Sequence, residues 1–513
     1  MPRKTPSGLT LLVSIDPDSP EPLYRQVYQE IREAILRGRV APGTRLPSTR
    51  TLAAELNVSR NTILTAFEHL WAEGYLEGKV GSGTRVSREL PDELLQVGAQ
   101  ATPVRPLLSR TPSISRRALV VAEAPFHLSS VSGPPRPFQV GLPAVREFPL
   151  DLWRRLAARR WRRSASELLN YGVSAGYRPL REVIASYLGS SRGVKCTADQ
   201  VLIVAGSQHA LDLAARVLLN PGDAVWMEDP GYHAARGAFI AAEAQIHPVP
   251  LDREGFDLTM ALERAPEARL AYVTPSHQFP VGVTMSLRRR LELLQWASRS
   301  SGWILEDDYD SEFRYVSRPI SALQGLDEDG RVIYTGTFSK VLFPSLRLGY
   351  LVVPDEVVDA FTAMLVFAST QAPTIEQAIL TDFIAEGHFE RHIRRMRSLY
   401  HERQEALIAT VNQEVKGLLE VRAAEAGMHL TAWLPPGIDD TAASEWVAEA
   451  GVSAMPLSAF AVEPPERGGL VLGYAGFTAY EVRTAGRRLG SALRSALAGG
   501  GVRGGHVCSQ SAG

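Results

Sequence analysis

The chain has 513 residues, of which 45% are hydrophobic and 22% charged, and its formal net charge is −1. This composition excludes a fibre, a coiled coil and a chain too polar to fold. No apolar run reaches the roughly 20 residues that span a bilayer, and the first residues lack the pattern of a signal peptide. Two cysteines are too few for a disulfide framework or a cysteine-based zinc site. We therefore expect a cytoplasmic, multidomain protein with no metal site and no membrane contact.

Composition along the chain predicts four parts. Residues 15–90 form a short block with helical and hairpin patterns. Residues 91–136 are rich in Pro, Ser and Arg, which is typical of a linker. Residues 137–497 alternate helical and strand-like patterns, as in an α/β domain. Residues 498–513 are rich in Gly and Ser, and we expect a flexible tail there.

The first block has the pattern of helices followed by a hairpin. Apolar residues recur at helical spacing between Leu23 and Ile35, and Ser48 and Ser59 are suitable N-caps for two further helices. A hairpin with a Gly-rich tip follows at residues 79–83. This order describes a winged helix-turn-helix, an α+β fold whose second short helix enters the major groove of DNA. A small helical domain with an ordinary polar surface is the alternative.

The local sequence favours the DNA-binding interpretation. The runs Pro42–Ala53, Val58–Thr62 and Gly74–Leu76 follow one another as in GntR-type regulators, which the block resembles. Because the block is only slightly basic, we expect a dimer that binds two half-sites. The resemblance implies DNA contacts at Arg45, Ser48, Arg50, Ser59, Arg60, Asn61, Thr62 and the hairpin tip Gly81, Ser82 and Gly83.

A lysine in an unusual setting stands out in the long block. A strand-like run reaches Thr337 and Ser339, then Lys340, and Arg347 follows. A lysine whose pKa is lowered by burial and nearby cations can form a Schiff base with an aldehyde. Hydroxyl groups and an arginine suit a phosphate dianion. The alternative is an ordinary surface lysine.

Acidic residues end a second strand-like run, Trp303–Asp308. Ligands of α/β sheets bind at the carboxyl ends of strands. There Asp307 could hold a pyridine nitrogen protonated through a charge-assisted hydrogen bond, and Tyr309 could donate to a ring oxygen. A solvated acidic loop is the alternative.

Three further segments have features of the same kind of site. Ser207 and Gln208 follow a strand-like run and open a helix, whose first amides form an anion site. Tyr232, on a turn after a strand, could stack on a planar ring, although a packing role is also open. The turn-rich loop 274–282 could bring polar groups to the same ring.

In this order and spacing the segments resemble a fold-type I aminotransferase of class I, and Gly427-Met428-His429 agrees with it. The resemblance implies an α/β transferase-like domain with a large mixed sheet, a smaller C-terminal α+β subdomain and the cofactor pyridoxal 5′-phosphate. It implies that Lys340 forms the Schiff base with the cofactor. It also implies contacts from Asp307 to the pyridine nitrogen, Tyr309 to the ring oxygen, Tyr232 to the ring face, Ser207, Gln208, Thr337, Ser339 and Arg347 to the phosphate, and Tyr171 from the partner subunit of a homodimer.

The whole architecture resembles the MocR/GabR subfamily of GntR-type transcriptional regulators. The resemblance implies a regulator that binds a double-stranded DNA operator and senses a small molecule, either an amino compound or pyridoxal phosphate itself. A working aminotransferase that carries a DNA-binding domain is the alternative. A regulator with a dead cofactor site is disfavoured because Lys340, Asp307 and Tyr309 are all present.

Two features depart from the pattern. Aminotransferases of this type hold the substrate α-carboxylate with a late arginine, and Val471 stands at the matching position, unless Arg467 or Arg483 takes that role. An effector without a carboxylate, or pyridoxal phosphate itself, would then be the signal. The Arg-rich stretch Arg154–Arg163 is either a solvated helix face or an additional phosphate-contacting patch.

Overall fold

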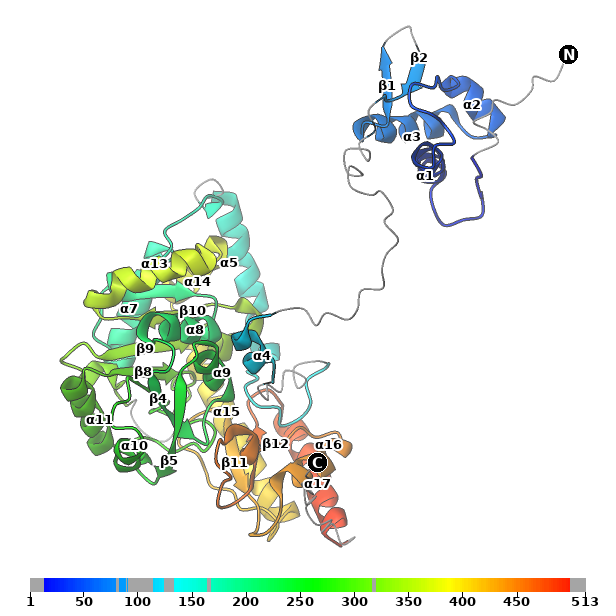
Figure 1. The fold of residues 1–513 in the computed structure, drawn as a ribbon. Coiled ribbons are helices and arrows are strands. Elements are labelled where there is room, and N and C mark those ends of the chain that lie inside the picture. Colours follow the sequence, from blue (N-terminus) through cyan, green and yellow to red (C-terminus); the bar gives the residue numbers. More distant parts are fainter. Residues whose placement is uncertain are drawn as a thin grey trace, which may run out of the picture. The chain divides into compact units, whose positions relative to one another are not determined.

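The structure, a computed structural model, describes residues 13–79, 83–88, 90, 114–123, 133–163, 168–315 and 320–498. The chain divides into two units, Met1–Ser113 and Ile114–Gly513, whose elements are labelled in Figure 1. The helices of the described residues include none that is long and apolar enough to cross a membrane.

The first unit has the predicted winged helix-turn-helix fold. The Ser48 and Ser59 side chains accept hydrogen bonds from Thr51 N and Thr62 N, both at 3.1 Å, and so cap the second and third helices. Between these helices Asn57 has a φ of 54°, the left-handed conformation of a tight turn. The elements are α1 (Leu23–Leu36), α2 (Thr49–Glu55), α3 (Arg60–Ala72), β1 (Leu76–Lys79) and β2 (Gly83–Val86). Their shared core includes Val27, Ile31, Leu52, Ile63, Phe67 and Leu70, all fully buried.

A large sheet and a small C-terminal sheet organise the second unit. The large sheet consists of β3 (Val201–Val204), β4 (Ala224–Asp229), β5 (Gln245–Asp252), β6 (Gly255–Phe256), β7 (Leu270–Val273), β8 (Trp303–Asp308), β9 (Val332–Thr337) and β10 (Gly349–Val352). The small sheet consists of β11 (His429–Trp433), β12 (Met455–Pro456) and β13 (Gly469–Gly473). The large mixed sheet and the smaller α+β part confirm the predicted fold class.

Helices cover both sheets. Those of the N-terminal and central parts are α4 (Arg116–Glu123), α5 (Leu150–Arg163), α7 (Arg178–Arg192), α8 (Ser207–Leu218), α9 (His233–Ala241), α10 (Leu258–Arg264), α11 (Leu287–Ser300), α12 (Phe338–Val341), α13 (Val358–Ser369) and α14 (Thr374–Ala385). The C-terminal ones are the long α15 (His388–Glu414), α16 (Asp440–Glu449), the 3-10 helix η8 (Leu457–Phe460) and α17 (Ala479–Ala498). In Figure 1, α16 and α17 lie with β11 and β12 at the orange and red end of the unit.

Alternating side chains of the large sheet face two helical layers. Leu202 and Val204 pack in a core with helices α8, α9 and α13, whereas Val201 and Ile203 pack in a core with α7, α14 and α15. Since both faces are buried, the strands are continuous apolar runs rather than alternating ones. This explains why short runs such as Val201–Val204 could be recognised as strands.

The strand order and directions bring several carboxyl ends of the large sheet to the same side. The order is β3-β10-β9-β8-β7-β4-β5-β6, and β9, β8, β7, β4 and β5 run parallel. Strand β10 is antiparallel to both β3 and β9, so β3 has the same direction as β9. The carboxyl ends of β3, β4, β7, β8 and β9 therefore meet at one edge.

Part of the stretch expected to be a linker is helical. Arg116–Glu123 forms α4, and Arg117 Nε lies 4.0 Å from Glu243 Oε1, just after α9. Residues 91–113 and 124–132 of this stretch lie outside the described part of the chain, as do 499–513 of the expected tail. The hairpin-tip residues Gly81 and Ser82 also lie outside it.

Candidate functional site

A cavity of about 440 Å³ opens where the carboxyl ends of the parallel strands meet. Most of its polar side chains lie at the carboxyl end of a strand or within a few residues after it, as expected for ligand sites of α/β sheets. The cavity is lined by Val140, Gly141, Ser207, Tyr232, His233, Ala234, Tyr272, Thr274, Phe279, Asp307, Tyr309, Thr337, Lys340, Arg347, Met428, His429, Met455 and Phe460. The segments that the sequence singled out separately therefore form one site.

Lys340 extends into this cavity from the short helix α12, which starts where β9 ends. Its Nζ donates a hydrogen bond to the carbonyl oxygen of Gly141 at 3.0 Å. Burial lowers the pKa of Lys340, which Asp310 and Asp307 partly offset, and Arg347 lowers it further. A lower pKa increases the neutral amine, which is the nucleophilic form. A Cβ on Gly141 would lie 2.7 Å from Nζ, so this glycine leaves room for the amine.

An anion cradle lies beside the lysine. Helix α8 starts at Ser207, so its first amides point toward the cavity end of β3. Arg347 has a φ of 51°, and its Nη2 donates to Ala205 O at 3.0 Å. A Cβ on Gly206 would lie 3.3 Å from the Arg347 guanidinium, so the glycine lets the arginine approach the start of the helix. The left-handed conformation of an arginine is uncommon and is typical of functional sites.

The other predicted phosphate residues divide into two groups. Thr337 lines the cavity, and its side chain accepts a hydrogen bond from Ser339 N at 3.2 Å. The Ser339 hydroxyl is buried and finds no partner among the described residues, although Ser339 is not one of the lining residues. Gln208 does not line the cavity either, because its Nε2 donates to Ala234 O at 3.0 Å.

Asp307 offers the cavity an unsatisfied carboxylate oxygen. Its Oδ2 accepts a hydrogen bond from the Tyr272 hydroxyl at 2.8 Å, while its buried Oδ1 has no partner among the described residues. Burial raises the pKa of Asp307 to about 7. An oxygen of this kind requires a donor, and a protonated pyridine nitrogen is one. The cavity therefore fits pyridoxal phosphate: an amine from Lys340, an acceptor from Asp307 and an anion cradle at Arg347.

Tyr309 belongs to a buried cluster; the sequence indicated Tyr309, the loop 274–282 and His429 separately, but neither Asp310 nor the contacts among them. Its hydroxyl donates to the carbonyl of His277 at 3.0 Å, and His277 Nδ1 lies 3.1 Å from Asp310 Oδ2. His429 Nε2 donates to Pro280 O at 3.2 Å. The ligand atoms of His277, Asp310 and His429 lie within 4.8 Å of one another; His277 Nδ1 and His429 Nε2 make protein hydrogen bonds, whereas the buried His277 Nε2 has no partner among the described residues. The cluster holds the Tyr309 side chain in place. In the sequence, the only signal for this cluster is that its members lie next to recognised motifs.

A second buried network fixes the acidic strand end. Arg192, from the end of α7, pairs with Asp308 at 2.8 Å, and the Tyr334 hydroxyl donates to the same Oδ2 at 2.7 Å. Glu228, at the end of β4, accepts hydrogen bonds from Thr274 Oγ1 at 2.6 Å and Gln278 Nε2 at 3.2 Å. Burial raises the pKa of Glu228 to about 7. Neither Arg192 nor Glu228 was recognised from sequence, because a charge buried far along the chain has no local signature.

Two predicted aromatic residues occupy different environments. Tyr232 lines the cavity, and its ring contacts Phe279 edge-on with centroids 5.6 Å apart. Tyr171 is 89% exposed and does not line the cavity of its own chain. Leu169 and Val173 beside it, and Phe367 on α13, are exposed as well. Gly172 N donates to the Gln371 side chain, which joins these two exposed segments.

Val471, Arg467 and Arg483 are the residues that the sequence analysis considered for the carboxylate-binding position. Val471 is fully buried in β13. Arg467 Nε donates to Leu434 O at 2.7 Å, and its Nη1 pairs with Glu420 at 2.8 Å. Arg483 is exposed on α17. Neither arginine lines the Lys340 cavity.

The Arg-rich stretch forms α5, and several of its arginines pair with acids. Arg159 lies 2.8 Å from Asp382 of α14, and Arg160 Nε donates to the same carboxylate at 2.8 Å. Arg155 and Arg162 are exposed and have no side-chain partner in the described part of the chain. The stretch therefore packs α5 on α14 and leaves some positive charge in solvent.

The predicted DNA-contacting residues of the first unit lie largely at its surface. Arg45, Ser48, Arg50, Ser59, Arg60 and Asn61 are exposed, and Thr62 is half-buried. Ser48 and Ser59 also serve as N-caps, so their hydroxyls are engaged at the helix starts. A Cβ on Gly83 would lie 2.8 Å from Arg45 Nε, which places the Arg45 side chain next to the tip end of the hairpin.

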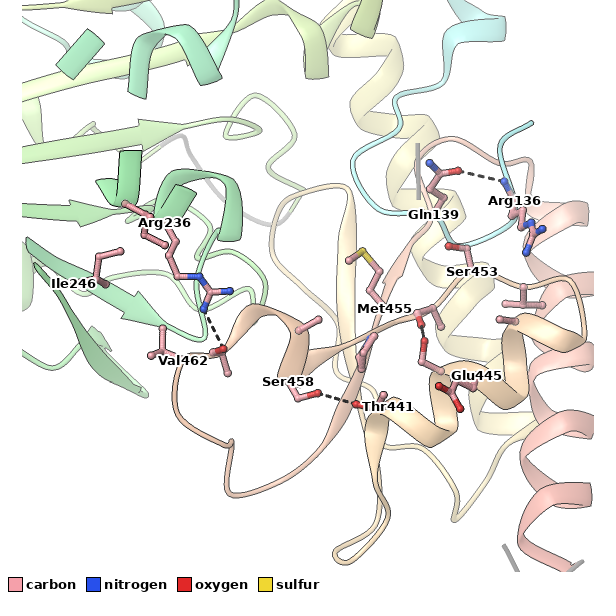
Figure 2. Close-up of a pocket in the computed structure, with 18 of the residues that line it drawn as sticks. Arg136, Gln139, Arg236, Ile246, Thr441, Glu445, Ser453, Met455, Ser458 and Val462 are labelled. Atoms are coloured by element: carbon pink, nitrogen blue, oxygen red, sulfur yellow. Dashed lines mark hydrogen bonds between the residues drawn. The ribbon is translucent and has the colours of Figure 1, made fainter. Parts of the chain in front are cut away.

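A larger hollow of about 1020 Å³ lies on the other side of the segment Met455–Phe460. Arg236 and Ile246 line it from α9 and β5, and Thr441 and Glu445 line it from α16, as Figure 2 shows. Met455 lines both this hollow and the Lys340 cavity. Arg236 Nη1 donates to Ala461 O at 3.2 Å across the hollow.

Comparisons with known proteins agree with both units. Residues 23–86 match the family described as "Bacterial regulatory proteins, gntR family", and residues 143–489 match "Aminotransferase class I and II". The chain is 42% identical over 468 residues to "Probable rhizopine catabolism regulatory protein MocR" of Rhizobium meliloti, covering 91% of this chain and 92% of that protein. It is 30% identical over 426 residues to the pyridoxine biosynthesis transcriptional regulator PdxR of Corynebacterium glutamicum, covering 82% and 85%.

Solved aminotransferases share the fold of the second unit. The α-aminoadipate aminotransferase LysN of Thermus thermophilus, complexed with N-(5′-phosphopyridoxyl)-L-leucine, has a TM-score of 0.69 and 30% identity. The match covers 75% of this chain and 98% of that one. Kynurenine aminotransferase of Pyrococcus horikoshii has a TM-score of 0.67 and 29% identity, covering 79% and 99%.

A GntR-type DNA-binding unit followed by an aminotransferase-like unit defines a class of protein, the DNA-binding transcriptional regulators with a ligand domain derived from an enzyme fold. Within that class, the chain belongs to the MocR/GabR subfamily of GntR-type regulators. Its cofactor is pyridoxal 5′-phosphate. The predictions of regulatory function and of cofactor are thus confirmed.

Proposed function

We propose that the protein is a cytoplasmic, homodimeric regulator in which the Lys340 cavity senses an effector and changes how the first unit binds its operator. The observation that supports this most directly is the conjunction of Lys340, Asp307 and Arg347 in one cavity with a DNA-binding unit in the same chain. When bound, the cofactor supplies an aldehyde that reacts reversibly with amines. A ligand that binds two arrangements of the protein unequally shifts the balance between them.

The residues of the site divide the work as follows. Lys340 would hold the cofactor covalently through its amine, whose lowered pKa increases the neutral, nucleophilic form. Asp307 would accept a hydrogen bond from the pyridine nitrogen through its unpartnered Oδ1, and Tyr309, which lines the same cavity, would contact the ring oxygen. Tyr232 packs on the ring. The phosphate is held by Arg347, Thr337, Ser207 and the amides of α8, with Ser339 and Gln208 in the surrounding layer.

A second copy of the chain completes the site. Tyr171 and Phe367 are 89% and 88% exposed, and the segments that carry them are joined through Gly172 and Gln371. Large apolar side chains that are exposed together mark an interaction surface. In the dimer the partner subunit's Tyr171 reaches the phosphate side of the cavity, and two DNA-binding units bind two half-sites.

In the first unit, we assign base reading to Arg60 and Asn61 at the start of α3. Both are exposed, and arginine and asparagine match the edges of guanine and adenine. Arg45, Ser48, Arg50, Ser59, Thr62 and the hairpin tip Gly81–Gly83 contact phosphates or sugars.

Selection of binding sites from a library of random duplexes, followed by gel shifts, tests the regulator function. We expect the wild type to recover a paired half-site, and the double variant Arg60→Ala, Asn61→Ala to lose specific binding while it keeps its visible cofactor absorbance. Glu68→Ala, an exposed change later in α3, should bind normally. Specific binding that survives the double change would contradict the assignment of α3. A wild type that selects no sequence would contradict the function itself.

A further inference from the structure

The Lys340 cavity has an apolar side built by the C-terminal part of the second unit. Met428 precedes β11, Met455 lies in β12, and Phe460 ends η8. Val140 and Phe279 continue this side from other segments. These five side chains face the space that a ligand attached at Lys340 would occupy beyond the cofactor.

Val471 is part of the same apolar layer. It is fully buried, opposite Thr431 and Met455 in the small sheet. It packs in one cluster with Phe460, Val140, Phe279 and Met455, all of which line the cavity. The position that resembles the carboxylate-binding arginine of aminotransferases therefore strengthens an apolar wall.

No other cation of the described residues replaces that arginine. The lysine and arginine side chains that line the described part of the cavity are Lys340 and Arg347. Lys340 is committed to the cofactor, and Arg347 lies beside Gly206 at the start of α8, where the phosphate is held. Burial lowers the pKa of His429 well below its usual value, and the neighbouring His277 adds to this, so His429 is neutral. Arg467 is occupied by Glu420 and Leu434.

We infer that the effector is a primary amine with an uncharged body and no α-carboxylate. This rests on the proposed sensing role of the cavity and names the class of ligand. A carboxylate placed against the Val471 layer would be buried without a counter-ion, which proteins strongly disfavour. An amine without a carboxylate avoids this desolvation cost, and its apolar body is stabilised by contact with Phe279, Met455 and Phe460.

Matched ligand pairs test the inference on the full-length, cofactor-loaded wild type. Phenethylamine and L-phenylalanine differ only in the carboxylate, as do 3-methylbutylamine and L-leucine. Binding is measured from the shift of the visible cofactor band and, independently, by calorimetric titration. We expect each amine to bind at least about 100-fold more tightly than its amino acid, the scale of one unpaired charged group. Equal binding, tighter binding of the amino acids, or no binding of either amine would overturn the inference.

The outcome is distinguishable from failure of the proposed function. A protein without a visible cofactor band, or without sequence-specific DNA binding, contradicts the proposed function. A protein that has both and prefers amino acids contradicts only the inference about the ligand.

Substitutions at Val471 test whether this residue causes the preference for amines over amino acids. Val471→Arg restores a cation at this position, and we expect it to reduce the preference for amines by at least about tenfold. Val471→Leu adds volume without charge and should leave the preference within about threefold of wild type. A Val471→Arg protein that keeps the cofactor band and an unchanged preference would overturn the role of this wall. If the variant does not fold, the ligand pairs on the wild type still decide.

Discussion

Replacing Asp307 with asparagine distinguishes two effects of this buried carboxyl group: it lowers the stability of the folded protein, and it binds the cofactor. Burial raises the pKa of Asp307 from 3.8 to about 7, although the hydrogen bond from Tyr272 lowers it. The folded protein therefore binds this proton more tightly than the unfolded chain does. Stability then falls as the pH rises from about 4 to 7 and stays low above that range. The resulting cost is about 2 kcal/mol at pH 5 and about 4 kcal/mol at pH 8.

Asparagine removes the loss of stability that comes from burying a carboxylate, and it also removes the negative charge that would pair with the pyridine nitrogen of the cofactor. We expect cofactor-free Asp307→Asn protein to be more stable than wild type, with a difference that grows by about 2–3 kcal/mol between pH 5 and pH 8. Cofactor affinity should fall by about 10- to 150-fold, because a hydrogen bond to a charged group contributes about 1.5 to 3 kcal/mol.

Urea unfolding of the cofactor-free protein, followed by tryptophan fluorescence at both pH values, measures the first effect, and cofactor titration measures the second. Asp359→Asn, on the exposed surface of α13, is the matched control and should change neither quantity appreciably. A stability difference that does not depend on pH would refute the raised pKa. Unchanged cofactor affinity would refute the pairing of Asp307 with the pyridine nitrogen.

Three other predictions concern separate parts of the molecule. Lys340→Ala should lose the visible cofactor band on gel filtration, which the wild type keeps; a band retained by the variant would remove the lysine from its role. Phe67→Ala should destabilise the first unit by about 3–5 kcal/mol in thermal unfolding, because Phe67 is fully buried, while Leu64→Ala, which is 36% exposed, should cost far less. Phe367→Glu should shift the dimer toward monomer in sedimentation, whereas Tyr480→Glu, an exposed aromatic on α17, should not; a dimer unaffected by Phe367→Glu would place the interface elsewhere.

Local chemistry made much of the fold predictable. Ser48 and Ser59 are recognisable caps, and the chain needs no distant partner to begin a helix at each. The order of the second unit was equally readable, because strands buried on both faces appear as short apolar runs. Asp307 and Lys340 lie at or just after the carboxyl ends of such runs, and Arg347 precedes the antiparallel strand β10, so the strand directions bring all three to one edge.

Long-range pairing explains what the sequence did not predict. Arg192 and Asp308 are far apart along the chain and pair only because α7 packs against the end of β8. His277 and Asp310 likewise meet only in the folded chain. Helix α4 lies in a stretch whose prolines and serines suggested only a linker, and its contact with the region of α9 is tertiary. In each case the structural role of the residue depends on a partner distant in the sequence, so the local sequence does not predict it.

The segment Met455–Phe460 has a consequence for communication within the second unit. It is a thin partition with the Lys340 cavity on one side and the larger hollow of Figure 2 on the other, and Met455 touches both. A displacement of this segment would change the lining of both spaces. If a molecule in the hollow favoured one position of the segment, thermodynamic linkage would require it and a ligand at Lys340 to alter each other's affinity by the same factor. The segment Met455–Phe460 is therefore the structural element that the Lys340 cavity and the larger hollow share.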